Sequence, residues 1–201
     1  MPDKMKEQPA DIRVFSIIFA LFLCVFMWVV PCPLRAATPG FYSSPKDGGV
    51  RLLEDREYFP AFMKAIHGAK DEIVMSFFLF KTNGYSKSYT DRVLAGLVRA
   101  AGRGVRVRIV LEGDNGSRGS LADKSNRETA ARLKGKGIDV RFDSPHVTTH
   151  AKVAVIDRRY IFLGSHNLTN SALKYNHELS VFIDSPSMAV EILRYIDLLH
   201  K

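Results

Sequence analysis

Hydrophobic residues recur along the chain with two distinct periods. Spacings of three and four residues, which place side chains on one face of a helix, predict helices over residues 55–67, 93–101, 125–134 and from Pro186 onward. Short apolar runs bounded by turn residues predict strands over residues 72–80, 105–111, 138–142, 150–156, 160–163 and 178–183. Because helices and strands largely alternate, we expect one α/β domain. Its central sheet is expected to be mixed and mostly parallel, with helices on both faces.

Capping signals mark the start of two of these helices. Ser125 and Glu128 have the spacing of a capping box, which predicts that a helix begins at this point. Ser185 followed by Pro186 is typical of an N-cap and the first helical position.

The N-terminal part of the chain has a different composition from the rest. Residues 14–30 form an apolar run preceded by Arg13, so residues 1–37 are predicted to be a secretory signal peptide or a retained membrane anchor. Residues 38–49 are rich in Pro, Gly and Ser and are expected to be a linker, which leaves residues 50–201 as the folded domain. We expect the protein to be exported to a periplasmic or extracellular location, either released by cleavage of the N-terminal segment or anchored to the membrane by it.

The positive charge belongs to the folded domain. The chain carries a formal net charge of +8, and the four basic and three acidic residues before Ala37 leave the remainder at +7. A basic balance favours polyanionic partners, either nucleic acid or an anionic membrane surface. Both cysteines, Cys24 and Cys32, lie in or beside the apolar run, so the domain has no cysteine with which to form a disulfide or bind a metal.

Two residues of unlike chemistry, His150 and Lys152, lie two positions apart in the predicted strand 150–156. Because side chains alternate between the faces of a strand, both are expected on the same face of an otherwise apolar segment. A hairpin at residues 157–159 should return residues 164–167, Gly-Ser-His-Asn, to the start of that strand. An imidazole, a fixed cation and neutral hydrogen-bonding groups can together supply the proton transfer and charge stabilisation that phosphodiester cleavage needs.

The complete spacing from His150 to Asn167 is His-x-Lys, four residues, Asp, six residues, Gly-Ser-x-Asn. This pattern matches the motif of the phospholipase D superfamily at every defined position. The chain therefore resembles that superfamily, and in particular its small single-motif members, the bacterial periplasmic nucleases. The resemblance implies a phospholipase D-like domain that hydrolyses phosphodiesters through a phosphohistidine, with no metal and no other cofactor.

The resemblance also implies a role for each matching side chain. His150 is expected to attack phosphorus, while Lys152 and Asn167 bind the phosphoryl oxygens. Ser165 is expected to assist that binding or to fix the loop. Glu178 falls where the family places an acidic residue, and it is expected to accept a hydrogen bond from His150 and orient its ring.

Two residues of the motif are expected to be structural. Asp157 begins a turn, where aspartate commonly accepts hydrogen bonds from backbone donors. Gly164 permits a close approach between backbones. Outside the motif, Phe77, Phe78 and Phe80 are expected to lie in the core.

The implied chemistry needs two histidines on opposite sides of phosphorus, whereas the chain has one His-x-Lys. The remaining histidines lack an equivalent setting: His67, His146, His166, His177 and His200. His146 and His166 could touch substrate, but we expect them to be surface or loop residues. We therefore expect an obligate homodimer with one composite active site, in which the second motif histidine comes from the partner chain.

Three functions are compatible with the sequence. The first is a nuclease of low sequence specificity, supported by the basic domain and the small size. The second is a phospholipase D acting on phosphatidylcholine or cardiolipin, supported by the apolar N-terminus, which could contact a membrane. The third is a non-catalytic nucleic-acid-binding protein, which the intact set of His150, Lys152 and Asn167 disfavours.

Overall fold

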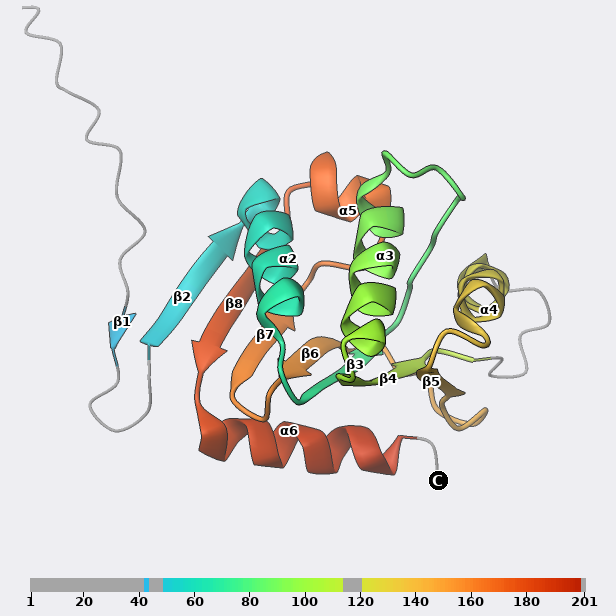
Figure 1. Ribbon diagram of the computed structural model, residues 1–201. Helices are drawn as coiled ribbons and strands as arrows, with labels where there is room; N and C mark the ends of the chain where they lie inside the picture. The colour runs from blue at the N-terminus through green and yellow to red at the C-terminus, as the bar shows by residue number, and fades with distance from the viewer. Residues whose placement is uncertain (1–41, 44–48, 114–120, 200–201) are drawn as a thin grey trace, which may run out of the picture. The chain divides into compact units, whose positions relative to one another are not determined.

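The computed structural model describes residues 42–43, 49–113 and 121–199 (Figure 1). The predicted signal or anchor at residues 1–37, most of the predicted linker 38–49, and His200 lie outside the described residues. Within the described ranges, no helix combines the length and the hydrophobicity needed to cross a membrane.

Eight strands form one sheet in the described part of the chain, in the order β1-β2-β8-β7-β6-β3-β4-β5. Their bounds are Tyr42–Ser43 (β1), Gly49–Glu54 (β2), Glu72–Phe77 (β3), Arg106–Leu111 (β4), Ile138–Phe142 (β5), Lys152–Ile156 (β6), Tyr160–Gly164 (β7) and Leu179–Asp184 (β8). A mixed α/β sheet is confirmed, but the expectation that it is mostly parallel is wrong. Only β3, β4 and β5 pair in parallel, and the other five pairings are antiparallel.

The connections between strands explain this mixture. Parallel neighbours need a long crossover, and helices supply it from β3 to β4 and from β4 to β5. The turn at residues 157–159 joins β6 to β7 as a hairpin, which forces that pair to be antiparallel. Asp157 and Arg158 in this turn have positive φ angles of 52° and 53°.

The helices largely follow the sequence pattern. Their bounds are Asp55–Glu57 (η1, a 3-10 turn), Tyr58–Gly68 (α2), Tyr89–Gly102 (α3), Leu121–Leu133 (α4), Asn170–Lys174 (α5) and Pro186–Leu198 (α6). The predicted cap of the last helix is confirmed, since the Ser185 hydroxyl accepts a hydrogen bond from the Met188 amide. The capping box at Ser125 is wrong, because α4 is already helical from Leu121 and Ser125 is buried within it. The short α5 was not predicted.

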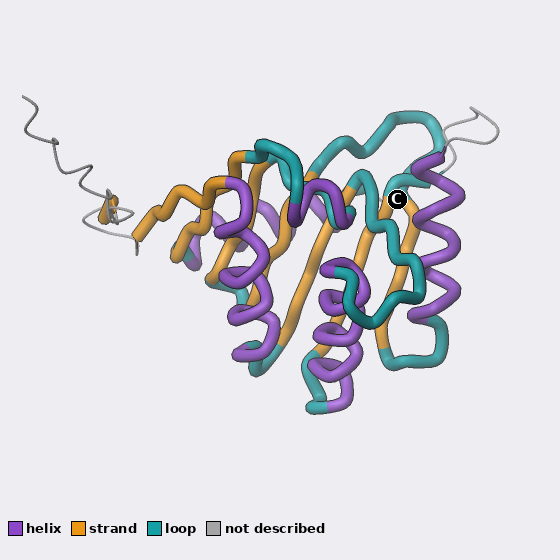
Figure 2. Tube along the Cα trace, turned by 90° about the horizontal axis from the view of Figure 1, so that it is seen from above, coloured by secondary structure: helices purple, strands orange, loops and turns teal. Residues whose placement is uncertain are grey.

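Helices cover both faces of the sheet, as expected. On one face α2 and α3 lie side by side and contribute Phe62, Ile66 and Leu97 to the larger core (Figures 1 and 2). On the other face α6 contributes Leu193 and Ile196 to a second core. The site lies at one end of the central strands. β6 runs antiparallel to both β3 and β7. The start of β6 therefore lies beside the ends of its two neighbours.

Candidate active site

Both ends of the motif, around His150 and around Asn167, are hydrogen-bonded to the segment that follows β3. The bonds are made by two consecutive residues of that segment, Phe78 and Leu79. The Phe78 amide donates a 2.9 Å hydrogen bond to the Ala151 carbonyl, between His150 and Lys152. The Leu79 carbonyl accepts a 2.9 Å hydrogen bond from the amide of Leu168, the residue after Asn167. Residues separated by more than a dozen positions in the sequence are thus fixed against the same short stretch of backbone.

His150 and Lys152 face the same aromatic ring. The ring of His150 lies 4.7 Å from the Phe78 ring, and the Lys152 Nζ lies 5.1 Å from its centre. β6 begins at Lys152 rather than at His150, so the predicted strand was two residues too long. His150 is therefore exposed at the mouth of the site, whereas Lys152 is only 8% exposed.

Phe78 is a site residue that the sequence analysis placed in the core. Phe77 and Phe80 are fully buried, but Phe78 is only partly buried and packs on His150. Alternation along the strand did not reveal this difference, because β3 is buried on both faces and Phe78 is the first residue after it.

Burial and a neighbouring carboxylate act in opposite directions on Lys152. Burial lowers the pKa of the Lys152 ammonium below its ordinary value, and the negative charge of Glu178 partly offsets this effect. The ammonium is thus poorly solvated and close to one carboxylate. Such a cation gains more from an incoming phosphate than a fully hydrated lysine would.

Gly164 and Ser165 join the motif to β8. A Cβ atom on Gly164 would overlap the side chain and the Cα of Ser180 on the adjacent strand, so only glycine fits this position. The Ser165 amide donates to the Leu179 carbonyl, and the Ser165 hydroxyl accepts from the Leu179 amide, both at 3.0 Å. The same hydroxyl donates to the Glu178 carboxylate.

The expected hydrogen bond from His150 to Glu178 is not present among the described residues. The Glu178 carboxylate instead accepts hydrogen bonds from the Ser165 hydroxyl and, at 3.1 Å, from the Asn176 side-chain amide. His150 precedes β6 and tilts against Phe78, which leaves Glu178 to Ser165. Glu178 thus binds Ser165 by a hydrogen bond and interacts electrostatically with the Lys152 ammonium.

Asp55 is a further residue of the site that the sequence analysis missed. Its carboxylate accepts a 2.8 Å hydrogen bond from the Glu178 amide, and its own amide donates to the Glu178 carbonyl at 2.9 Å. The hydrogen bond from the Glu178 backbone, followed by one from His177, lowers the pKa of Asp55. No local motif identifies Asp55, because its partners are more than 120 residues away in the chain.

Asn167 carries an unsatisfied atom. Its side-chain oxygen is buried and has no hydrogen-bond partner in the part of the chain that the structure describes. Buried polar atoms without partners are uncommon in folded proteins. An arriving ligand with a donor, or a turn of the amide toward a phosphate, would satisfy this side chain.

Asp157 holds the β6–β7 turn against the start of β3. Its carboxylate accepts hydrogen bonds from three consecutive backbone amides, at distances of 2.8–3.2 Å, namely those of Lys70, Asp71 and Glu72. These contacts support the structural role that was expected.

His166 contradicts the expectation that it lies on the surface or in a loop. It is 1% exposed, stacks on Tyr58 at 4.3 Å, and its two ring nitrogens contact the Ser180 hydroxyl and the Asp55 carbonyl. Burial lowers its pKa, which favours the neutral ring. His166 is a packed structural residue beneath the motif.

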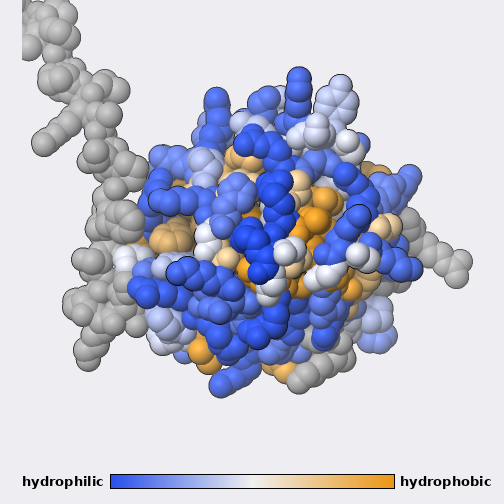
Figure 3. Space-filling view, viewed as in Figure 1, coloured by the Kyte–Doolittle hydropathy of each residue, from blue (hydrophilic) through white to orange (hydrophobic). Residues whose placement is uncertain are grey.

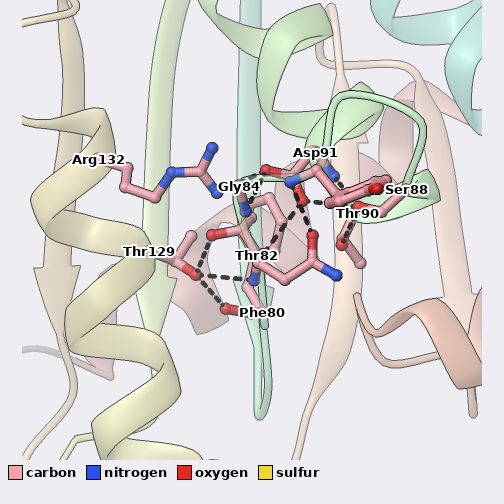
Figure 4. Close-up of polar contacts among 10 residues, drawn as sticks. Phe80, Thr82, Gly84, Ser88, Thr90, Asp91, Thr129 and Arg132 are labelled. Carbon is pink, nitrogen blue, oxygen red and sulfur yellow. Dashed lines mark hydrogen bonds and ion pairs between the residues drawn. The ribbon is translucent and has the colours of Figure 1, made fainter.

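Polar contacts from α4 and α3 brace the segment that carries Phe78 (Figure 4). The Thr129 hydroxyl donates to the Phe80 carbonyl at 2.6 Å and accepts from the Thr82 amide at 3.2 Å. Farther along, the Asp91 carboxylate forms a 2.6 Å ion pair with Arg132 and accepts from the Gly84 amide. These contacts fix the segment that follows Phe78 from Phe80 to Gly84.

Comparison with known proteins places this site in a family. Residues 62–199, which include the whole motif, match the family described as "Cardiolipin synthase, PLD-like domain". The chain belongs to the phospholipase D superfamily. The recognised resemblance is therefore confirmed.

Several members of this superfamily are similar to the chain. Phospholipase D of Rickettsia conorii is 32% identical over 102 residues, covering 51% of this chain and 48% of that protein. Cardiolipin synthase B of Escherichia coli K12 is 33% identical over 125 residues, covering 59% of this chain and 29% of that protein. The chain thus spans about half or less of the length of these curated relatives.

Solved structures of the superfamily share the fold over most of the chain. Nuc from Salmonella typhimurium is 27% identical with a TM-score of 0.60, over 74% of this chain and 91% of that one. NucT from Helicobacter pylori has a TM-score of 0.58 and covers 75% and 94% of the two chains, but at 17% identity it supports the fold alone. The phospholipase D-like architecture is therefore shown, and the similar proteins include a phospholipase D, a cardiolipin synthase B and the phospholipase D family member Nuc.

Proposed function

We propose that the protein is a phosphodiester hydrolase that uses His150 as its nucleophile and requires no metal ion. The observation that carries this proposal is the placement of an exposed imidazole and a buried ammonium on the ring of Phe78. Leu168, the neighbour of Asn167, is bonded to the next residue of the same segment, and the side-chain oxygen of Asn167 is buried without a partner among the described residues. A nucleophile, a fixed cation and a neutral polar group are thus placed along one short segment of backbone. That combination suits a phosphoryl group, whose charge must be stabilised while one ester bond breaks.

The proposed reaction has two steps. A nitrogen of His150 attacks phosphorus, the bond to the leaving oxygen breaks, and the partner's His150 donates a proton to that oxygen. The partner's His150 then takes a proton from water, which attacks phosphorus and releases His150. Lys152 and Asn167 bind the phosphoryl oxygens in both steps, and Glu178 fixes Ser165 beside them.

A second copy of the chain is proposed to complete the site, and an apolar strip offers a surface for it. The strip consists of Leu52, Leu163, Leu179 and Val181, which point to one face of neighbouring strands. Leu52 and Leu163 flank Val181 in register, and the three leucines are 41%, 41% and 54% exposed. Leu163 of this strip is two residues before Ser165 of the motif. A two-fold axis through the strip would therefore bring the motifs of two chains together.

Nucleic acid is the proposed substrate, cleaved without sequence preference. A groove of about 440 Å³ is lined by residues of α2, α3, α4 and the loop before α3. Its lining includes the basic residues His67, Arg92, Arg99 and Arg132, of which Arg132 pairs with Asp91 in the same groove. The surrounding face of the molecule is largely hydrophilic, with small apolar patches (Figure 3). Guanidinium groups suit the repeated phosphates of a polynucleotide.

Phospholipid hydrolysis is the second candidate. It is favoured by the curated relatives named phospholipase D and cardiolipin synthase B, which are more similar in sequence than Nuc is. Export of the protein, with residues 1–37 cleaved or retained as an anchor, remains a proposal that suits either substrate.

One set of assays separates these candidates. The full-length chain is offered single-stranded DNA, duplex DNA, RNA and vesicles of phosphatidylcholine or cardiolipin, each with excess chelator. We expect nucleic-acid cleavage that weakens steeply with salt, no vesicle hydrolysis, and no activity in His150→Ala. Vesicle hydrolysis alone would move the assignment to a phospholipase, and loss of all cleavage with chelator would exclude the metal-free reaction.

A further inference from the structure

Two carboxyl groups outside the motif meet at the residue that precedes His150. Glu112 directly follows β4 and Asp143 directly follows β5, and these strands are parallel neighbours in register. The Thr149 amide donates to the Glu112 Oε2 at 2.5 Å and to the Asp143 Oδ2 at 3.1 Å. Glu112 and Thr149 are 3% and 4% exposed, so this contact is almost completely shielded from water.

We propose that Glu112 and Asp143 are positioning residues for the nucleophile: sharing one proton, they clamp the Thr149 amide and so fix where His150 enters the site. The proposal rests on the proposed function of His150. Neither carboxyl group contacts the substrate in this account, because both act through the backbone.

The surroundings explain why the pair should keep a proton. A buried and a half-buried carboxylate that share one donor repel each other unless one of them is protonated. Burial, followed by a hydrogen bond that the protonated Glu112 carboxyl donates to Asp143, raises the pKa of Glu112 to about 7. The hydrogen bond from the Thr149 amide acts in the opposite direction but does not outweigh these two effects. The other charged groups facing Glu112 are Asp123 of α4, which raises the pKa further, and Arg127, which pairs with Asp123.

The backbone of Glu112 and the side chain of Asp143 are held by further hydrogen bonds. The two carboxyl groups can therefore fix the position of the Thr149 amide. The Asn126 side chain donates to the Glu112 carbonyl at 3.0 Å and also to the Phe78 carbonyl at 2.9 Å. The Asp143 carboxylate accepts a second hydrogen bond, from the Gly113 amide, at 2.7 Å. The same framework therefore holds both the clamp and the ring on which His150 rests.

Loss of the shared proton should loosen the clamp. Above neutral pH the two negative charges repel, and the Thr149 amide can satisfy only one of them well. His150 would then sample positions away from the phosphorus, which lowers kcat more than it changes KM. Displacement of a reacting group by about 1 Å can cost on the order of 100-fold in rate.

The activity test compares three substitutions in the full-length chain. Glu112→Gln keeps an acceptor for Thr149 but cannot ionise. We expect its kcat to lie within about 3-fold of the wild-type value at pH 6, and to decrease less than the wild-type kcat does between pH 6 and 8.5. Glu112→Ala removes the acceptor and should lower kcat about 10- to 100-fold with KM changed less than about 3-fold. Glu128→Gln, which neutralises an exposed carboxylate on α4, should match the wild type.

A second readout is independent of activity. The NMR signal of the Thr149 amide should titrate with a midpoint near pH 7 in the wild type and in Glu128→Gln, and should not titrate in Glu112→Gln. The same Thr149 titration in Glu112→Gln as in wild type, or an unchanged kcat in a folded Glu112→Ala, would overturn the proposal. If the wild type cleaves no phosphodiester, the proposed function fails, while the Thr149 titration still decides whether the clamp exists.

Discussion

The Lys152 ammonium donates a 2.7 Å hydrogen bond to the backbone carbonyl of His150. The cation proposed to bind the phosphate is thereby tied to the main chain of the proposed nucleophile. Because both side chains also contact Phe78, the three residues form one unit whose parts cannot shift independently. The following predictions concern this unit and the contacts that support it.

Replacing Lys152 by methionine should lower kcat by roughly 10²–10³-fold, because it removes one group that stabilises charge in the transition state. Methionine fills a similar volume, so the melting temperature should change little or rise as a buried charge is lost. Steady-state kinetics and thermal melts test this prediction. Lys124→Met, on the exposed side of α4, is the control and should retain full activity. Equal activity in both variants would remove Lys152 from the mechanism.

Replacing Glu178 by glutamine should lower the pKa of Lys152 further. Burial already depresses this pKa, and the carboxylate of Glu178 opposes the depression by favouring the charged ammonium. Without that charge the ammonium loses its proton at a lower pH, so any activity that requires it should fall earlier as the pH rises. Carbon-13 NMR titration of the Lys152 side chain measures the shift directly. An unchanged or higher Lys152 pKa in the variant would contradict the account.

Replacing Gly164 by alanine should disrupt the pairing of β7 with β8. The new methyl group would overlap Ser180 and the Leu179 carbonyl, and backbone atoms cannot move aside as side chains can. We expect a loss of unfolding free energy of about 3 kcal/mol or more, measured by urea denaturation. Gly102→Ala, at the end of α3, meets no neighbouring atom and should be nearly neutral. A folded, fully stable Gly164→Ala protein would show that the close approach is not required.

Charge placed on the apolar strip should separate the two copies of the chain. Leu52→Glu and Leu163→Glu would each bury a carboxylate in the proposed interface, so we expect a monomer in sedimentation and loss of turnover together. Leu121→Glu changes a more exposed leucine, on α4, and should leave both properties intact. A monomer that retains full activity would rule out the composite site.

The sequence predicted most of the helices and strands, but it did not predict which strands pair in parallel and which pair antiparallel. Apolar spacing located the helices around Phe62 and Leu97, and short apolar runs located β6 and β7. It could not show that β6 pairs with β3 rather than extending a parallel sheet, because pairing direction depends on contacts between distant segments. The unpredicted α5 is only five residues long, too short for a helical period to appear in the sequence.

The same distinction applies to the site. A local motif contained His150, Lys152 and Asn167, so their residue types and spacing were sufficient to identify them. The partners of that motif, Asp55 and Phe78, come from other parts of the chain and became apparent only in the folded structure. His166 shows the reverse error, since its place inside the motif says nothing about its burial against Tyr58.

Trapping of the covalent intermediate tests the central claim most directly. The full-length protein is mixed with a phosphodiester substrate in the presence of chelator, quenched within the first turnovers, and digested for mass spectrometry. We predict a phosphoryl adduct on the peptide that contains His150, and none in His150→Ala. An adduct on another residue, or turnover with no adduct and undiminished activity in His150→Ala, would contradict the account.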